Sequence, residues 1–324
     1  MTLLKDIKGQ NNAVRYLANS LSSGRVASSY LFIGTDGVGR ALTAKAFLKE
    51  LICGRKRDVK EACGICPSCQ RVDTLDHPDI TWIKPEKNKK IKIEEVRKAR
   101  EVLNMKPFES SVNACVIEDA HMMTVEASNA LLKVLEEPPG ESILILISSK
   151  RDMLLPTIIS RCSEVRFNSL PVDMTKNIIM QNSEVSEKDA SFLASFSEGS
   201  PGRALEMIEE EVIERKNGLL EMLKEIAEEE NVSCLNWDVD KKDQLIEDVE
   251  LLIMFFRDIA VSKEGMKGLV LDKDIFDAGL YDYFGGYDID KIRNIVEKLV
   301  DVKRALLGNI NPKLVAQVLP AQLK

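Results

Sequence analysis

Apolar residues in the first half of the chain follow two different spacings. Short runs that are apolar throughout, or that alternate with polar residues, predict strands, whereas apolar residues three or four positions apart predict helices. Strands are predicted at residues 30–33, 79–83, 114–117 and 142–148, and helices at residues 11–21, 41–51, 93–103 and 127–135. Strands that alternate with helices are typical of a parallel sheet covered on both faces. The first half therefore predicts an α/β domain.

Strand patterns nearly vanish after residue 170, and helical spacing takes over. Helices are predicted at residues 174–180, 188–196, 219–226, 245–259 and 292–307, with others beginning near Arg203 and after Pro312. We expect three domains: an α/β domain over residues 1–168, a small helical domain over residues 169–207 and an all-α domain over residues 208–324.

The composition restricts the class of protein. The 324 residues are 44% hydrophobic and 30% charged, which excludes a disordered chain. Apolar runs such as residues 143–147 are far shorter than the ~20 residues of a membrane-spanning helix. The N-terminus has no basic segment followed by an apolar signal core. We expect a soluble cytoplasmic protein.

Charge is unevenly distributed along the chain. The net charge is −7 overall, but residues 1–100 carry +9 and residues 1–170 carry +5, whereas residues 171–210 carry −5 and residues 211–324 carry −7. A basic first half and an acidic second half suggest different partners for the two halves. Random variation in surface charge explains the same numbers, so charge alone does not decide.

A glycine-rich loop follows the first predicted strand and opens the next helix. Its sequence is Gly34-Thr-Asp-Gly37-Val-Gly39-Arg40, and glycines in this place let backbone N–H groups converge on a phosphate. The working motif ends in Lys-Ser/Thr, which contact phosphate and Mg²⁺. Here Arg40 replaces the lysine and Ala41 the hydroxyl residue, and Thr43 comes two positions too late.

The acidic pair expected after the second buried strand also departs from a working site. An Asp-Glu order is expected there, but the chain has Glu118-Asp119. Missing metal and phosphate contacts remove transition-state stabilisation, each typically worth ~10²-fold or more in rate. We therefore predict a nucleotide-type fold that does not hydrolyse ATP. Weak nucleotide binding through the backbone alone is the alternative.

Four cysteines form the most specific chemical motif in the chain. They are Cys53, Cys63, Cys66 and Cys69. Four thiolates suit tetrahedral zinc, and clustered cysteines in an intracellular protein favour metal over disulfides. A redox Cys-x-x-Cys is the rival interpretation, against which the number of cysteines argues. We predict a structural zinc site, since four protein ligands leave no open position for a substrate.

The remaining candidates for metal or thiol chemistry have simpler explanations. Cys115, Cys162 and Cys234 are scattered, and Cys115 lies in a predicted buried strand, where a small apolar side chain is expected. His77 precedes a proline, and we expect it to cap a turn.

The chain resembles the clamp-loader branch of the AAA+ family. Residues 128–139, Ser-Asn-Ala-Leu-Leu-Lys-Val-Leu-Glu-Glu-Pro-Pro, are similar to the signature helix of that branch, and Ser160-Arg161-Cys162 matches its Ser-Arg-Cys motif. The cysteine insertion matches the zinc module of bacterial clamp-loader subunits. The segment Gly199-Ser-Pro-Gly-Arg203 resembles the part of the lid that carries the second sensor, and residues 309–314 resemble the closing helix of the collar. Gln317 departs from the expected glutamate.

The resemblance implies a fold and roles for particular residues. It implies an AAA+ P-loop-type parallel sheet domain with a zinc insertion, a helical lid and a helical collar. Arg161 would act as an arginine finger on ATP bound by a neighbouring subunit. The degenerate nucleotide site would comprise Gly34, Gly37, Gly39, Arg40 and Arg203, so ATP binding is doubtful. Ser148 and Ser149 occupy the first-sensor region, where we expect a polar structural role.

The resemblance also implies partners. The damaged loop beside an intact Ser-Arg-Cys motif distinguishes the chain from the tau/gamma motor subunits, so we expect a subunit without intrinsic ATPase activity in a DNA polymerase holoenzyme. Its partners would be tau/gamma ATPase subunits, a delta subunit, the sliding clamp and primer–template DNA. Two alternatives stay open: a clamp-loader ATPase with an unusual loop, and a zinc-bearing nucleic-acid-binding protein unrelated to replication.

A group of lysines lies between the second strand and the following helix. Its members are Lys84, Lys87, Lys89, Lys90 and Lys92, with Trp82 nearby. Lysines contact phosphates without sequence specificity and in a salt-sensitive manner, so contact with DNA is one interpretation. A solvated hairpin loop is the other.

Overall fold

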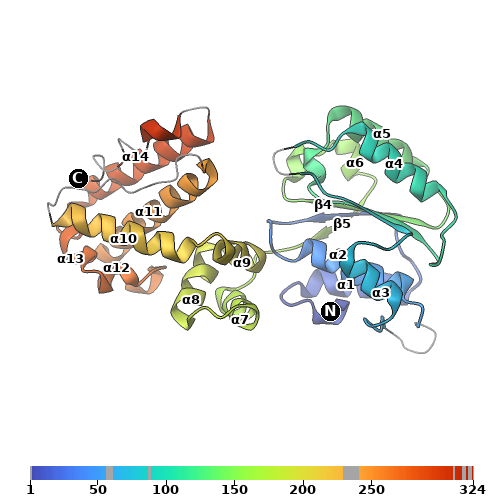
Figure 1. Cartoon of the computed structure of the whole chain (residues 1–324), viewed down its shortest axis with the longest axis horizontal. Helices are drawn as coiled ribbons and strands as arrows, with labels where there is room; N and C mark the ends of the chain where they lie inside the picture. Colours follow the sequence, from blue (N-terminus) through green and yellow to red (C-terminus); the bar gives the residue numbers. More distant parts are fainter. Residues whose placement is uncertain are drawn as a thin grey trace. The chain divides into compact units, whose positions relative to one another are not determined.

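The computed structural model describes residues 2–55, 61–86, 89–228, 241–308 and 311–315, together with residues 319 and 323. The chain divides into two compact units (Figure 1). The first unit comprises Met1–Gln181 and Ser197–Arg203, and the second comprises Asn182–Phe196 and Ala204–Lys324.

A five-stranded parallel sheet forms the centre of the first unit. Its strands are β1 (Ser29–Ile33), β2 (Ile80–Ile83), β3 (Asn113–Ile117), β4 (Ser142–Ser148) and β5 (Ser163–Arg166), in the order β2-β3-β4-β1-β5. Every pairing between these strands is parallel. The predicted α/β class with a P-loop-type parallel sheet is confirmed. Strand β5 was not predicted, because it lies at the sheet edge and buries only Val165.

Helices cover both faces of this sheet (Figure 1). They are α1 (Asn11–Ser22), α2 (Arg40–Ile52), α3 (Pro67–Thr74), α4 (Ile93–Asn104), α5 (Val125–Glu136) and α6 (Pro156–Ile159). Short 3₁₀ helices lie at Leu4–Asp6, Ala120–Met122 and Arg151–Met153.

Strand β4 shows why its sequence is apolar throughout. Ile143, Ile145 and Ile147 pack in the core shared with α1 and α2, whereas Leu144 and Leu146 pack in the core shared with α4 and α5. Successive side chains of a strand point to opposite faces, so a strand covered on both sides is apolar at every position.

The second unit is helical. Helix α7 (Val172–Asn182) leads from the first unit to the second. The second unit contains α8 (Glu187–Phe196), most of α9 (Pro201–Glu209), α10 (Val212–Ala227), α11 (Lys242–Lys263), α12 (Asp274–Asp277), α13 (Leu280–Phe284) and α14 (Ile289–Leu307). A short 3₁₀ helix lies at Lys267–Leu269. Helix α11 packs along α14, and Phe256 meets Phe284 edge to face. The boundaries at 168 and 207 stay a prediction. Most residues of the helix predicted after Pro312 lie outside the described residues, as do Gln317 and Cys234.

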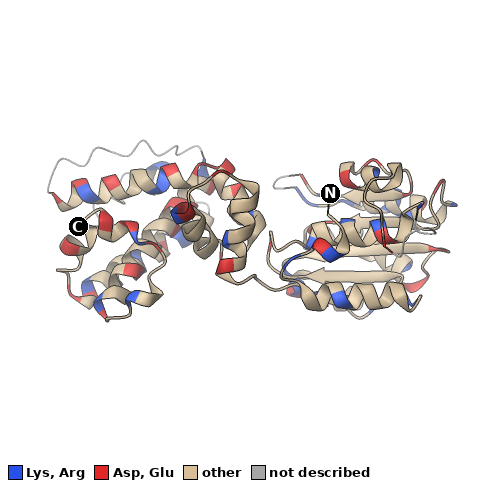
Figure 2. Cartoon of the chain, turned by 90° about the horizontal axis from the view of Figure 1, so that it is seen from below, with Lys and Arg blue, Asp and Glu red and all other residues tan. Residues whose placement is uncertain are grey.

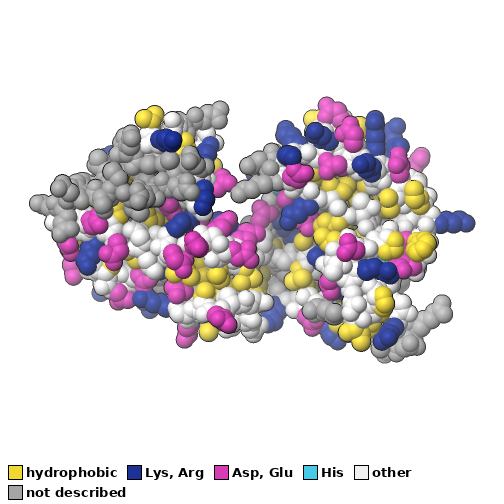
Figure 3. Space-filling view, in the orientation of Figure 1, with side chains coloured by type: hydrophobic (Ala, Val, Ile, Leu, Met, Phe, Trp, Pro, Cys, Tyr) yellow, Lys and Arg dark blue, Asp and Glu magenta, His cyan; other side chains and the backbone are white. Residues whose placement is uncertain are grey.

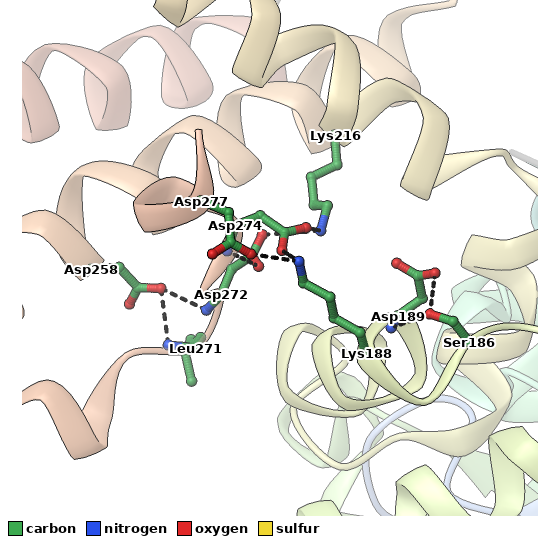
Figure 4. A network of polar contacts seen from close by, with 9 residues as sticks. All are labelled: Ser186, Lys188, Asp189, Lys216, Asp258, Leu271, Asp272, Asp274 and Asp277. Atoms are coloured by element: carbon green, nitrogen blue, oxygen red, sulfur yellow. Dashed lines mark hydrogen bonds and ion pairs between the residues drawn. The ribbon is translucent and has the colours of Figure 1, made fainter. Parts of the chain in front are cut away.

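A buried polar network connects four helices of the second unit (Figure 4). The Lys216 side chain of α10 is 1% exposed, and its ammonium lies 3.1 Å from Asp272 and 2.5 Å from Asp274. Lys188 of α8 also pairs with Asp274, and Asp258 of α11 accepts the backbone N–H groups of Leu271 and Asp272 at 2.9 Å. Each buried charge has an opposite charge or a hydrogen bond, as burial requires. The network therefore fixes the segment around α12 to α8, α10 and α11.

Acidic side chains recur along the helices of the second unit (Figure 2). This distribution agrees with the negative charge of residues 211–324. Among the residues that the structure describes, no helix has both the length and the apolar character needed to cross a bilayer.

Candidate functional site

The glycine-rich loop connects β1 to α2 in the first unit. Gly37 and Gly39 have positive φ angles of 74° and 96°, and α2 begins at Arg40. The described residues offer no hydrogen-bond acceptor to the backbone N–H groups of residues 35–39. Such unbonded N–H groups at a helix N-terminus are the groups that a phosphate-binding turn uses, and phosphate binding by this loop stays a prediction.

Arg40 occupies the lysine position of this loop and is buried. Its guanidinium forms an ion pair with Asp36, and its Nη1 atom has no hydrogen-bond partner among the described residues. Arg40 therefore supplies positive charge inside the loop, but its planar guanidinium does not reproduce a lysine ammonium.

No side chain takes the metal-binding hydroxyl position. Ala41 stands there, and the Thr43 hydroxyl, one turn along α2, donates a 2.8 Å hydrogen bond to the Gly39 carbonyl oxygen. The Thr43 hydroxyl is thus hydrogen-bonded to the backbone at the start of its own helix. The loop contains no side-chain oxygen placed as Mg²⁺ binding in a P-loop requires.

The two acidic residues after β3 have different surroundings. Glu118 accepts a 2.8 Å hydrogen bond from the Trp82 indole and lies 3.5 Å from Lys84. Asp119 has a left-handed backbone, and its pKa is raised by burial and by the negative charge of Asp36. The order of the pair, Glu118 before Asp119, is the reverse of the Asp-Glu order expected.

Two further polar residues border this region and were not predicted. His121 Nδ1 lies 3.2 Å from the buried Ser148 hydroxyl, and burial lowers the pKa of His121. Asp36, which pairs with Arg40, also faces the loop. His121 belongs to no motif, and Asp36 occupies a variable position of the glycine-rich loop, so the sequence contained no signal for their contacts. The contacts of Ser148 agree with the polar structural role expected for it.

The segment Gly199–Arg203 lies against the loop, although about 160 residues separate them. The Ser200 hydroxyl donates to the Asp36 carbonyl oxygen at 2.6 Å, and the Gly202 N–H donates to the Gly37 carbonyl oxygen at 2.9 Å. The structure therefore brings together Gly37 and the segment that carries Arg203.

Arg161 lies on the surface between α6 and β5. Its Nη2 is 2.9 Å from Glu136 Oε1 at the end of α5, its Nη1 donates to the Thr157 carbonyl oxygen at 3.1 Å, and its side chain is 36% exposed. The neighbouring Cys162 thiol is largely buried, which raises its pKa to about 12. Arg161 and Ser160 of this motif are therefore exposed, whereas Cys162 is not.

The four cysteines lie together beside α2 and α3. Cys53 follows α2, Cys66 caps the N-terminus of α3, Cys69 lies in α3, and Gly64 between them has a positive φ. All four sulfur atoms lie within 4.8 Å of one another, with Cys53–Cys63 at 3.6 Å and Cys53–Cys66 at 4.0 Å. Bonds of ~2.3 Å to a tetrahedral zinc imply sulfur–sulfur separations of about 3.8 Å. The cluster can hold a metal ion of this type.

The pKa values of the thiols in the cluster are shifted in different directions. Burial opposes ionisation of Cys63, but the N–H groups of Ile65 and Cys66 lower its pKa to about 7. Burial raises the pKa of Cys53 and Cys69. His77 lies outside the cluster, and its Nδ1 accepts the Asp79 N–H at 3.2 Å, which confirms the predicted turn cap.

The described part of the lysine-rich segment does not join antiparallel strands, so the hairpin geometry is wrong, but its exposed lysines fit a solvated loop. Strand β2 pairs in parallel with β3, and Ile91 forms a parallel bridge with Met123. All four described lysines of the segment are exposed, and two of them, Lys84 and Lys89, lie beside the acidic partners Glu118 and Glu86. Lys87 lies outside the described residues. Basic side chains over α4 and α5 are interspersed with acidic ones in the space-filling view (Figure 3).

The sheet, the glycine loop and the segment that carries Arg203 define the class of protein: a P-loop-type AAA+ protein whose loop lacks the lysine and the hydroxyl. A sequence model described as "DNA polymerase III, delta subunit" matches residues 9–171, half of the chain. The chain belongs to this family. The predicted resemblance is confirmed at this level.

Curated relatives agree with this assignment. The chain is 24% identical to the delta' subunit of DNA polymerase III from Bacillus subtilis over 93% of this chain and 92% of the relative. It is 38% identical to the delta' subunit of Pseudomonas aeruginosa over 42% of each chain. It is 29% identical to the tau subunit of B. subtilis over 64% of this chain. That match spans only 37% of the tau subunit, which is a longer protein.

Proposed function

We propose that the chain is a delta-prime-type clamp-loader subunit of DNA polymerase III that does not hydrolyse ATP itself. It assembles with tau/gamma ATPase subunits and a delta subunit and helps to load the sliding clamp onto primed DNA. The observation that carries the proposal is a loop without lysine or hydroxyl beside an exposed Arg161 in an intact Ser-Arg-Cys motif.

Arg161 would act in trans as the arginine finger. Its pair with Glu136 is solvent-exposed on both sides, and exposed pairs are typically worth only ~0–1 kcal/mol. The guanidinium can therefore leave Glu136 for a neighbour's triphosphate at little cost. Stabilisation of charge on a transferred phosphoryl group by such an arginine is worth ~10³–10⁵ in rate.

The structural roles of the other predicted residues follow from this proposal. Gly34, Gly37, Gly39, Arg40 and Arg203 form the remnant of a nucleotide site. Cys53, Cys63, Cys66 and Cys69 hold a structural zinc ion, which would supply cross-linking of the segment between α2 and β2 rather than chemistry. Lys90 and Lys92 are the exposed candidates for phosphate contacts with primer–template DNA.

The test is an Arg161→Ala substitution in the complex reconstituted with tau/gamma and delta subunits. We expect DNA-stimulated ATP turnover at the neighbouring site to fall ~10³-fold or more, while assembly on a sizing column is unchanged. Arg166→Ala is the matched control, because Arg166 is also an exposed arginine paired with a glutamate in the first unit. Unchanged turnover in an intact Arg161→Ala complex would exclude the finger role.

A catalytically active, tau/gamma-like ATPase is the second candidate. It is favoured by the 29% identity to a tau subunit, which exceeds the 24% identity to the delta' subunit of the same organism. The isolated chain distinguishes the two candidates. We expect no Mg-ATP hydrolysis above background, whereas turnover that disappears in an Arg40→Ala variant would establish the second candidate.

A further inference from the structure

The carbonyl oxygens of the glycine loop are bound by groups from elsewhere in the first unit. Ser200 Oγ donates to Asp36 O at 2.6 Å, Gly202 N–H donates to Gly37 O at 2.9 Å, and Gln10 Nε2 donates to Val38 O at 3.2 Å. Gln10 and Ser200 are both buried. Three successive peptide units of the loop are thus fixed by the chain itself.

Gln10 is in turn held in place by the segment after β5. Its Nε2 donates to the Asn168 carbonyl oxygen at 2.7 Å, and its Oε1 accepts the Asn168 N–H at 3.1 Å. A buried amide whose donor and acceptor atoms are both engaged has one fixed orientation. Gln10 is therefore a rigid support for the loop.

Gly37 and Gly202 approach each other too closely for any side chain. A Cβ on Gly202 would lie 2.7 Å from Gly37 Cα and 2.9 Å from Gly37 O. A Cβ on Gly37 would lie 2.3 Å from Ser200 Oγ and 2.5 Å from the Arg203 nitrogen. The two glycines let the loop backbone and the start of α9 pack against each other directly.

We propose that Gln10, Ser200 and Gly202 form an internal lock that holds the glycine loop to the start of α9 without any nucleotide. The buried Arg40, paired with Asp36, supplies positive charge within the same loop. Helix α9 begins in the first unit and continues into the second. The lock thus fixes the point at which the chain leaves the sheet unit. It is independent of the proposed role of Arg161.

Hydrogen exchange of the full chain tests the lock. In the wild-type protein, peptides covering the loop and the start of α9 should exchange equally slowly with and without Mg-ATP. In Gly202→Ala, both segments should exchange about tenfold faster or more, since a hydrogen bond is lost and two backbones are forced apart. Peptides from α4 and α5 should be unchanged.

Gly218→Ala is the matched control, because an added Cβ at this position in α10 meets no atom within 4 Å. It should leave the loop and α9 unchanged. Ser200→Ala covers the case in which Gly202→Ala does not fold: it adds no bulk, removes the donor to Asp36, and should give a smaller increase in the same two segments. Ser191→Ala, which removes a hydroxyl that donates to Glu187 O, is its control.

Two results would overturn the lock. One is wild-type protection of the loop and α9 that develops only on addition of Mg-ATP. The other is unchanged exchange of both segments in a folded Ser200→Ala or Gly202→Ala protein. Arg161→Ala should not alter exchange in either segment, so failure of the finger proposal and failure of the lock are separate outcomes.

Discussion

At the scale of single residues, Asp79 shows how one buried carboxylate organises a loop. Its oxygen atoms accept the backbone N–H groups of Phe108, Glu109 and Ser110 at 2.5, 3.0 and 2.8 Å. Burial alone would raise the pKa of Asp79, but these hydrogen bonds hold it below its ordinary value. The turn before β3 therefore depends on an ionised side chain.

We predict that Asp79→Asn destabilises the protein by about 1.5–3 kcal/mol at pH 7, the usual contribution of hydrogen bonds to a charged group. A carboxyl group with a lowered folded-state pKa stabilises the protein fully above its unfolded-state pKa of about 3.9, and that stabilisation is lost as the pH falls through the folded-state pKa. Urea unfolding of both proteins between pH 7 and pH 3 measures the difference.

The difference in free energy of unfolding between wild type and Asp79→Asn should thus be constant above pH 5 and should decrease only at acid pH. Asp76→Asn is the control, because Asp76 is exposed and lies in the same segment. An unfolding free-energy difference that is as large at pH 3 as at pH 7, or an equal destabilisation by Asp76→Asn, would contradict the role of the ionised Asp79.

At the scale of elements, the cysteine cluster determines where α3 lies. Cys66 caps this eight-residue helix and Cys69 lies within it, while Cys53 ends α2. A helix this short is marginal on its own. A metal ion bound by all four thiolates would join α3 to the end of α2.

We predict about one zinc ion per chain by elemental analysis, and loss of that zinc in a Cys66→Ser, Cys69→Ser double variant. Chelation should expose residues 61–75 to proteolysis, because metal binding and local folding are coupled. Cys162→Ala removes a cysteine outside the cluster and should keep the metal. Zinc retained by the double variant would refute the ligand set.

At the scale of the whole molecule, charge is divided between the two halves of the sequence. Residues 1–170 carry +5, and the exposed lysines after β2 lie in this half, whereas residues 211–324 carry −7. A basic surface attracts nucleic acid and an acidic one repels it. We therefore expect DNA to approach the first unit.

We predict that Lys90→Ala together with Lys92→Ala weakens binding of the reconstituted complex to primer–template DNA. Each lost phosphate contact should reduce the slope of log affinity against log salt concentration by ~0.9 on duplex DNA. Fluorescence anisotropy of labelled DNA at several salt concentrations measures the affinity and this slope. Lys298→Ala, an exposed lysine of α14, should leave the slope unchanged, and an unchanged slope in the double variant would exclude this DNA contact.

Much of the fold followed from local patterns. The buried runs of β1, β3 and β4 and the amphipathic spacing of α1, α4 and α5 identified these elements, because burial on two faces or on one leaves a direct pattern in the sequence. Strand β5 left no such pattern, since an edge strand with one buried residue resembles a polar loop. Helices α12 and α13 were too short to show a period.

The sequence by itself determined the chemistry available at the candidate site: a loop without lysine or hydroxyl, an inverted acidic pair, four clustered cysteines and Arg161 in its motif. The tertiary structure decided which of these groups meet. Gln10 and Ser200 reach the glycine loop from distant positions in the chain, and Arg161 pairs with Glu136. Such contacts depend on how helices and strands pack, and no local spacing records which distant residues the packing brings together.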